Sequence, residues 1–406
     1  MSGEQVKQGY KRTEVGVIPE DWEATALKNV TLDMVQGVNT AIDRPEYVQD
    51  GIPMLKANNV IDEEVIFEGA DHISRKTFSG YKDRFILKKN DFLFSNIGAR
   101  LGTGSLLRVD IECSFAWNVM RIVPDTRKIN PDYFNYFINS PKFSQEIRGM
   151  QSGSGMGFVP KGVMQNACIA MPSLLEQCDI ATVLSDVNAL LNKLDQLIAK
   201  KHDLKQATMQ QLLTGQTRLP GFSGEWEVKR LGDVVEIRKG QLITERDAIH
   251  GDIPVIAGGK KPSYFHNRPN RVGKTITVSA SGASAGYVAF FDSPIFASDC
   301  STISDVKTYS IEFIYFQLLL KQDEIYLAQT GGAQPHIHAV DLMPLEVGMC
   351  SLEEQAAIAN VLSDMDAELA SLESRRDKTR ALKQGMMQEL LTGRIRLISA
   401  EEGGAK

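Results

Sequence analysis

The chain contains the same fifteen-residue phrase twice, and this repeat limits its fold more than any other feature. SLLEQCDIATVLSDV begins at Ser173 and SLEEQAAIANVLSDM begins at Ser351. Residues 171–219 align with residues 349–397 without a gap, and 26 of the 49 positions are identical. Such identity indicates an internal duplication, so we expect two equivalent structural elements in one chain.

Each copy of the repeat carries the start and stop signals of one long helix. A serine is followed three residues later by a glutamate: Ser173 and Glu176 in the first copy, Ser351 and Glu354 in the second. This is the pattern of a capping box, in which the serine accepts from a free N–H and the glutamate reaches back. Each copy ends in Leu-Leu-Thr-Gly, and glycine suits a helix end. We therefore predict two helices of about 40 residues, each about 60 Å long.

Between these signals the apolar residues recur at alternating spacings of four and three, which is typical of a coiled-coil seam. The seam comprises Ile180, Leu184, Val187, Leu191, Leu194 and Ile198 in the first copy and Ile358, Leu362, Met365, Leu369 and Leu372 in the second. Arg376 then interrupts the second stripe. We predict that the two copies pack on each other. The alternative is two separate amphipathic helices, each buried in its own core.

A weaker internal resemblance precedes each helix. Trp22 in IPEDWEATALKNV corresponds to Trp226 in FSGEWEVKRLGDV, and SNIGARLG (95–102) corresponds to SASGASAG (279–286). Short β-rich runs alternate with Gly-rich turns, which indicates a mixed α+β chain. Short helices are expected at 131–148 and 309–328. The predicted order is globule, helix, globule, helix, with limits at 1–170, 171–217, 218–348 and 349–406.

Three near-matches to catalytic or metal-binding motifs have simpler structural explanations. NPDY (130–133) differs at its third residue from the base-stacking loop of amino-methyltransferases, and its asparagine before proline suits a helix start. GKT (273–275) lacks the first glycine of a phosphate loop. HIH (336–338) offers two imidazoles but no third ligand. We predict that the chain is not an enzyme and holds no metal or cofactor of its own.

Charge gives a local rather than a global signal. The net charge of −6 does not by itself predict a nucleic-acid partner. However, residues 258–274 contain five basic side chains and no acidic one, with two aromatic side chains among them. Residues 74–89 contain six basic side chains and one acidic one. Such tracts can neutralise phosphates while their aromatic rings pack on sugar or base; the alternative is a solvated Lys-rich loop.

Other features bear on the compartment. The five cysteines show no CxxC spacing, which indicates reduced thiols. No apolar run reaches the ~18 residues of a membrane span, and the polar start has no signal-peptide core. We expect a cytoplasmic protein with no membrane partner.

The phrase P-x-L-x-E-Q-x-x-I-A-x-V-L-S-D, present twice and followed each time by a long helix, resembles the specificity (S) subunits of type I restriction–modification systems. Here it occurs as MPSLLEQCDIATVLSDV and MCSLEEQAAIANVLSDM, with Cys350 in place of the proline of the first copy. VGVIPEDWE and GEWEV also resemble the domain starts of that family. The resemblance covers the whole chain.

The resemblance implies that each globule is a target recognition domain, and that the helices are spacers paired as an antiparallel coiled coil in a pseudo-twofold body. The two domains would read the halves of a split, asymmetric double-stranded DNA site. Two modification (M) subunits would bring S-adenosylmethionine and methylate one adenine in each half-site, and restriction (R) subunits would use ATP and Mg²⁺. The open alternative is a protein-interaction scaffold, or a degenerate S subunit, without specific DNA binding.

We expect the base contacts beside the Gly-rich loops, because Arg and Lys suit guanine edges and Asn suits adenine. The candidates are Lys56, Asn58, Asn96 and Arg100 in the first domain and Lys260, Lys261, Arg268, Arg271 and Ser281 in the second. The loop residues Ser95, Gly98, Ser279 and Gly282 are predicted to shape the backbone. Trp22 and Trp226 are predicted to belong to the domain cores.

Overall fold

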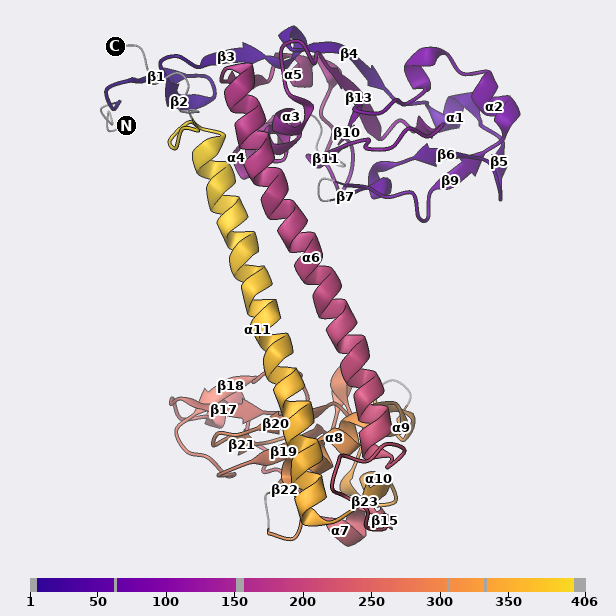
Figure 1. Cartoon of the computed structure of the whole chain (residues 1–406), viewed down its shortest axis with the longest axis vertical. Helices are drawn as coiled ribbons and strands as arrows, with labels where there is room; N and C mark the ends of the chain where they lie inside the picture. The colour runs from indigo at the N-terminus through magenta and orange to yellow at the C-terminus, as the bar shows by residue number, and fades with distance from the viewer. Residues whose placement is uncertain (1–5, 62–63, 151–156, 305–306, 332–333, 398–406) are drawn as a thin grey trace. The chain divides into compact units, whose positions relative to one another are not determined.

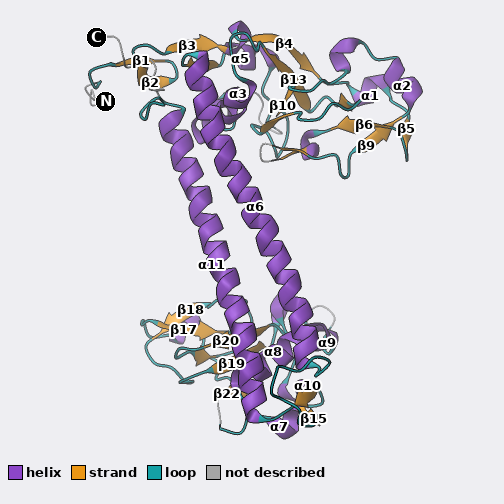
Figure 2. Ribbon diagram, viewed as in Figure 1, coloured by secondary structure: helices purple, strands orange, loops and turns teal. Residues whose placement is uncertain are grey.

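The computed structural model describes residues 6–61, 64–150, 157–304, 307–331 and 334–397 (Figure 1). The chain forms two compact units: unit 1 contains residues 1–193 and 376–406, and unit 2 contains residues 194–375. Two long helices, α6 (Leu174–Leu213) and α11 (Leu352–Leu390), cross this division, so each unit contains one end of both. Helices and strands are mixed in both units, which confirms the predicted α+β class (Figure 2).

Unit 1 contains two four-stranded sheets and three two-stranded ladders. The first sheet has the order β11-β10-β13-β4, and the second has the order β12-β6-β9-β5. The ladders are β1-β2, β3-β14 and β7-β8. The strands are β1 (Tyr10–Thr13), β2 (Gly16–Pro19), β3 (Glu23–Ala26), β4 (Thr31–Gln36), β5 (Tyr47–Val48), β6 (Ile52–Leu55), β7 (Val60–Ile61), β8 (Glu64–Val65), β9 (Asp71–Ile73), β10 (Phe92–Ser95), β11 (Gly104–Leu106), β12 (Ser114–Phe115), β13 (Val119–Pro124) and β14 (Cys168–Met171).

Unit 2 repeats this plan with fewer strands. Its four-stranded sheet has the order β20-β19-β22-β16, its three-stranded sheet the order β18-β17-β21, and β15 pairs with β23. The strands are β15 (Glu227–Arg230), β16 (Ile237–Lys239), β17 (Ile253–Ile256), β18 (Tyr264–His266), β19 (Thr275–Ser279), β20 (Val288–Phe291), β21 (Phe296–Ala297), β22 (Cys300–Ser304) and β23 (Glu346–Met349). The four-stranded sheet matches β11-β10-β13-β4 strand for strand, so the two globules share one topology.

The short helices flank these sheets. Unit 1 has α1 (Thr40–Asp43), α2 (Arg75–Ser79), α3 (Pro131–Ile138), α4 (Pro141–Gly149) and α5 (Lys161–Asn166), and unit 2 has α7 (Leu231–Val234), α8 (Ile311–Leu320), α9 (Gln322–Leu327) and α10 (Ala339–Leu342). Each of the two predicted short helices is therefore a pair, α3–α4 and α8–α9. Asn130 is the N-cap of α3, because its Oδ1 accepts from the N–H groups of Asp132 and Tyr133; this confirms the structural explanation of NPDY.

The starts of the long helices confirm only half of the predicted capping box. The Ser173 hydroxyl accepts from the Glu176 N–H at 3.2 Å, and the Ser351 hydroxyl accepts from the Glu354 N–H at 3.3 Å. The glutamate carboxylates do not reach back. Each binds an arginine that follows the end of the other long helix, because the carboxylates are buried and a guanidinium neutralises them better than a backbone N–H.

We call these two contacts the arginine clamps. In unit 1, Arg396 binds Glu176 through Nε and Nη2 at 2.7 and 2.9 Å, and also binds Asp21 at 2.9 and 2.7 Å. In unit 2, Arg218 binds Glu354 in the same two-pronged manner, with Nη2 at 2.6 Å from Oε2. Arg218 and Arg396 occupy equivalent positions of the repeat, so each helix end is fixed to the start of the other helix.

The ends of both helices confirm the predicted glycine stop. Gly215 follows α6 and Gly393 follows α11, with φ values of 71° and 67° that side chains rarely adopt. Both glycines also lie against tryptophan rings. A Cβ on Gly215 would approach Trp226 at 3.2 Å, and a Cβ on Gly393 would approach Trp22 at 3.2 Å.

Some of the apolar seam residues belong to the hydrophobic cores of the globules, and the others lie along the middle of the two long helices. Ile180 and Leu184 belong to the core of unit 1, which includes Trp22, and Ile358 and Leu362 belong to the core of unit 2. Trp22 is wholly buried and Trp226 packs half-buried against the second core, which confirms the core assignment of both. Of the remaining seam residues, Leu191, Leu194, Ile198 and Leu369 are buried, and Val187, Met365 and Leu372 are half-buried.

Ion pairs join the two long helices within unit 2. Lys201 pairs with Glu368 at 2.7 Å, and Lys205 pairs with Asp366. The higher number on α6 meets the lower number on α11, so these two segments run antiparallel.

Candidate nucleic-acid interface

Four loops of unit 1 meet where strands β4, β6, β10 and β12 end, and we call them loop cluster 1. They are residues 36–39, 56–59, 95–102 and 116–118. Hydrogen bonds tie the four loops together. Gln36 and Asn96 exchange two side-chain bonds, at 2.8 and 3.0 Å, and the Ala57 N–H donates to Asn118 Oδ1 at 3.4 Å. Val38 N–H donates to the Phe115 carbonyl at 2.9 Å, so the first loop also joins the last.

The equivalent strand ends of unit 2 carry loop cluster 2, which comprises residues 239–243, 256–261, 279–286 and 297–300. The Ser281 hydroxyl bonds to the Asp299 carboxylate, and the Ile243 N–H donates to the Ser298 hydroxyl at 3.2 Å. The Gln241 N–H donates to the Ala297 carbonyl at 2.9 Å, as Val38 does to Phe115 in unit 1. The two clusters therefore share a backbone plan while their side chains differ.

The Gly-rich loop has the same backbone in both clusters. Gly98 and Gly102 have φ values of 90° and 94°, and their counterparts Gly282 and Gly286 have 78° and 80°. Glycine is required at such angles because a Cβ would strain the backbone. Each loop is bonded to a later segment: Gly98 N–H donates to the Gly157 carbonyl at 3.2 Å, and Gly282 N–H donates to the Pro335 carbonyl at 3.0 Å. The prediction that these glycines shape the loop is confirmed.

The four candidates of the first domain all lie in loop cluster 1, but they are not equally available. Asn58 is exposed and Arg100 is half-exposed. Lys56 is half-exposed, pairs with Asp71 and lies 5.6 Å from the Tyr47 ring centre. Asn96 is wholly buried, since Gln36 and the Val159 carbonyl occupy its amide. Its predicted role as a base contact is corrected: Asn96 connects the loops.

In the second domain, three of the five candidates are exposed: Lys260, Lys261 and Arg268. Lys260 lies over the Tyr287 ring at 5.3 Å. The Ser281 hydroxyl is bound to Asp299, as described above. Arg271 is half-exposed, and its guanidinium donates to Thr302 Oγ1 at 2.9 Å and to the carbonyls of Asn270 and Lys239 at 2.9 and 3.0 Å. These bonds connect it to strands β16 and β22, and its role as a base contact stays a prediction.

The sequence analysis missed Trp117, whose side chain is 45% exposed in loop cluster 1. A tryptophan after an apolar β-rich run is usually a core residue, and Trp22 shows that outcome in the same unit. No local pattern separates the two cases. Exposure depends on the turn in which Trp117 lies, and that turn is fixed by residues distant in the sequence.

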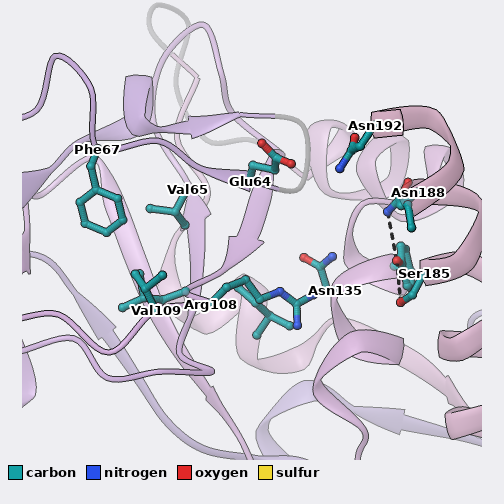
Figure 3. A pocket seen from close by; sticks show the side chains of 13 residues that line it. Glu64, Val65, Phe67, Arg108, Val109, Asn135, Ser185, Asn188 and Asn192 are labelled. Carbon is teal, nitrogen blue, oxygen red and sulfur yellow. Dashed lines mark hydrogen bonds between the residues drawn. The ribbon is translucent and has the colours of Figure 1, made fainter. Parts of the chain in front are cut away.

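A separate hollow of about 550 Å³ opens in unit 1 between α6 and the strands β8 and β11 (Figure 3). Glu64 and Arg108 line it from the globule, and Asn188 and Asn192 line it from α6 (Figure 3). Asn135 also lies on its wall. In unit 2, the residue equivalent to Asn135 is Tyr315, whose ring packs on Phe290 and Phe316 at 5.3 Å in both cases.

Burial raises the pKa of the Cys300 thiol, at the end of loop cluster 2, to about 12, so this thiol stays protonated at neutral pH. In the part of the chain that the structure describes, no group of three or more His, Cys, Asp or Glu side chains is placed to bind a metal ion. Within the same described ranges, every helix is too short or too polar to cross a membrane.

Known proteins match this chain along most of its length. A family model described as "Type I restriction modification DNA specificity domain" matches residues 19–201 and 223–379. The putative type I restriction enzyme MjaX specificity subunit of Methanocaldococcus jannaschii is 23% identical, over 96% of this chain and 97% of its own length. The type I restriction enzyme EcoBI specificity subunit of Escherichia coli is 24% identical, over 49% of this chain and 43% of its own.

Solved structures agree in fold. The crystal structure of the S subunit of a type I restriction–modification system from M. genitalium has a TM-score of 0.63 at 15% identity, covering 91% of this chain and 96% of that one. A chain from a structural study of complex assembly in a type I system has a TM-score of 0.55 at 16% identity, covering 93% and 99%. The two family matches contain both loop clusters and residues 174–201 and 352–379 of the two long helices. This chain therefore belongs to the type I restriction–modification DNA specificity family.

Proposed function

We propose that the chain is the DNA-reading subunit of a type I restriction–modification complex, and that each globule reads one half of a bipartite, asymmetric site. One observation carries this proposal: the two loop clusters share a strand order and loop backbone but present different side chains. A common frame with different loops is what two readers of two different half-sites require. It also explains why the half-sites would be unlike each other.

The exposed residues of the clusters support DNA as the ligand. In unit 2, Lys260 and Lys261 are exposed in loop cluster 2, and Arg268 is exposed in the loop after β18. Basic side chains of this kind bind phosphates or guanine edges. In unit 1 the exposed polar candidates are Lys56, Asn58 and Arg100. Neither globule is basic as a whole, so we propose that partner subunits supply much of the contact to the phosphate backbone.

We further propose that α6 and α11 form an antiparallel coiled coil in a pseudo-twofold body. The reciprocal arginine clamps and the ion pairs between α6 and α11 support this arrangement. A twofold body has two equivalent surfaces, so it suits two identical M subunits. The half-sites would lie about one DNA turn apart, roughly 34 Å, on one face of the duplex.

Catalysis lies in the partner subunits of these systems, and this chain supplies recognition. In this proposal the M subunits bind S-adenosylmethionine and methylate adenine, and R subunits use ATP and Mg²⁺. The assembled complex would act in the cytoplasm, where the cellular DNA is accessible to it.

The test is a methylation map of the host genome followed by a domain exchange. Residues 222–345, within the predicted second domain (218–348), are replaced by the corresponding segment of a relative, and the complex with M subunits is expressed. We expect methylated adenines in a bipartite site, of which only one half changes after the exchange. A change in both halves would exclude two independent readers. If the complex of the natural chain, before the exchange, shows no sequence preference, a protein-interaction scaffold is favoured instead.

A further inference from the structure

Trp117 is held rigidly while its ring is exposed. It occupies the second position of the turn Ala116–Val119, which is closed by a bond from the Val119 N–H to the Ala116 carbonyl at 2.9 Å. The Trp117 N–H donates to the Val38 carbonyl at 2.8 Å, and its own carbonyl accepts from the Gln36 side chain. Both backbone polar groups are therefore satisfied internally, and the frame of loop cluster 1 fixes the backbone from which the ring projects.

This exposure is unfavourable for the isolated protein. Tryptophan carries one of the largest apolar surfaces of any side chain, and leaving nearly half of it in water sacrifices the gain from burial. The other two tryptophans of the chain pack in or against the cores, so the fold is able to cover such rings. An exposed aromatic ring on a fixed backbone among polar loops is instead suited to a ligand, because little backbone entropy is lost when it binds.

Unit 2 lacks this feature because its turn is shorter. The Gly37 N–H donates to the Val119 carbonyl in unit 1, and the Gly240 N–H donates to the Cys300 carbonyl in unit 2. Since Phe115 corresponds to Ala297, three residues separate the paired positions in unit 1 and only two in unit 2. The extra residue makes the turn that carries Trp117. In unit 2 the shorter turn carries Asp299, which binds Ser281.

The neighbours of Trp117 indicate the kind of ligand. Asn118 ties the turn to the 56–59 loop, which presents exposed Asn58 beside Lys56. An aromatic ring next to amide and ammonium groups suits a DNA duplex, whose sugars and thymine methyl groups offer apolar surface and whose phosphates and base edges offer charge and hydrogen bonds. We infer that Trp117 contacts DNA directly and packs its indole ring on a nucleotide of the half-site read by unit 1. This inference rests on the proposed function.

The test compares Trp117→Ala and Trp117→Phe with Leu32→Ala, in the complete complex with M subunits. Leu32 is a matched control, because it is 62% exposed on strand β4 of the same unit but lies at the far end of that strand from Gln36. The probes are a duplex with the site mapped from genomic methylation, the same duplex with the first half-site scrambled, and one with the second half-site scrambled. Tryptophan emission and duplex affinity are both measured.

We expect Trp117→Ala to weaken binding to the intact site about tenfold or more, the order of one direct contact in a DNA groove, with a smaller loss for Trp117→Phe. The Leu32→Ala variant should bind normally. In the complex without substitutions, adding DNA should change the tryptophan emission. This change should disappear in Trp117→Phe, and it should require the first half-site, meaning the one that unit 1 reads and that stays unchanged in the domain exchange. Since Trp117 is 45% exposed, Trp117→Phe should barely change the melting temperature and Trp117→Ala should lower it only modestly.

Normal affinity of Trp117→Ala, with the emission change retained in Trp117→Phe, would overturn the inference while leaving the proposed function intact. An emission change produced by M subunits alone, and not increased by DNA, would also overturn it, because Trp117 would then face a protein. Failure of the unmodified complex to prefer the intact duplex would instead overturn the proposed function and this inference with it.

Discussion

The two arginine clamps are built from the same parts but use them differently. In unit 1, Arg396 bridges Glu176 and Asp21, and the Trp22 indole N–H donates to Glu176 at 3.0 Å. In unit 2, Arg218 bonds to Glu354 and to the Gly224 carbonyl, and the Trp226 indole nitrogen is buried without a partner in the described part of the chain. Both arginines lie over the tryptophan ring of their unit, at 5.5 and 5.8 Å.

The glutamate–arginine pair is common to both copies of the repeat, whereas the additional contacts around it differ between the two units. The glutamate–arginine pair is present in both copies, with the carboxylates almost wholly buried, at 6% and 2% exposure of the side chain. Such a pair fixes geometry rather than adding large net stability, because desolvation offsets most of the attraction. The bond from tryptophan and the contact with Asp21 are found in unit 1. Unit 1 therefore gives its buried glutamate carboxylate three hydrogen bonds, two from Arg396 and one from Trp22.

The largest expected effect concerns the seam, where the two copies are equivalent. Leu191 and Leu369 occupy matching positions and are 8% and 4% exposed. Changing both to Asp would bury two uncompensated charges and destabilise the fold by about 4 kcal/mol or more. We expect loss of soluble, M-subunit-binding protein, measured by yield and light scattering. The control is Leu197→Asp with Leu382→Asp, at 39% and 60% exposure on the same helices; normal assembly of the seam variant would contradict the coiled-coil proposal.

The second prediction compares the clamps directly. Arg218→Ala and Arg396→Ala each leave a buried carboxylate without its cation, which costs about 3–5 kcal/mol in typical cases. We expect Arg218→Ala to lower the free energy of unfolding more than Arg396→Ala does. After the loss of Arg396, Glu176 still accepts a hydrogen bond from the Trp22 indole N–H. After the loss of Arg218, Glu354 has the Cys350 thiol beside it, which is a weaker donor. Urea denaturation measures the difference. A larger loss for Arg396→Ala would show that Asp21 matters more than Trp22.

The third prediction uses the two tryptophans. Trp22→Phe removes a donor from the buried, charged Glu176, so we expect a loss of about 1–3 kcal/mol beyond any packing effect. Trp226→Phe removes an indole N–H that has no partner among the described residues, so its loss should be smaller. Thermal unfolding of both variants compares them. Equal losses would mean that the Trp22 bond contributes nothing beyond packing.

The smallest effect concerns pH. The Arg396 guanidinium lowers the pKa of the Asp21 carboxyl below its ordinary value of 3.8, so the folded state binds this proton less readily than the unfolded state. The stabilising contribution is therefore complete above about pH 4 and is lost as the pH falls through the lowered pKa. Asp21→Asn should reduce the free energy of unfolding slightly at neutral pH. It should also make that free energy decrease less steeply as the pH falls below about 4. Glu225→Gln is the matched control, because Glu225 is the exposed counterpart in unit 2.

The candidate site was only partly predictable. The Gly-rich loops were located correctly because glycine spacing is a local signal of left-handed backbone. Asn96 was misjudged as a base contact, and the internal bonds of Arg271 were not foreseen, because a polar residue near such a loop can bind the protein itself as well as DNA. Gln36 lies 60 residues before Asn96, and Thr302 lies 31 residues after Arg271. No sequence pattern near either residue predicts its hydrogen-bond partner.

The sequence by itself determined the duplication, the two long helices with their serine caps and glycine stops, and the mixed α+β globules. These features depend on residue spacing and backbone preference over short segments, so local sequence patterns are enough to predict them. Only the tertiary structure decided that Glu176 and Glu354 bind arginines from the opposite helix, that Asn96 is buried and that Trp117 is exposed. Burial and pairing are properties of residues brought together from distant positions, and the free energy of desolvation that governs them does not exist until the chain has folded.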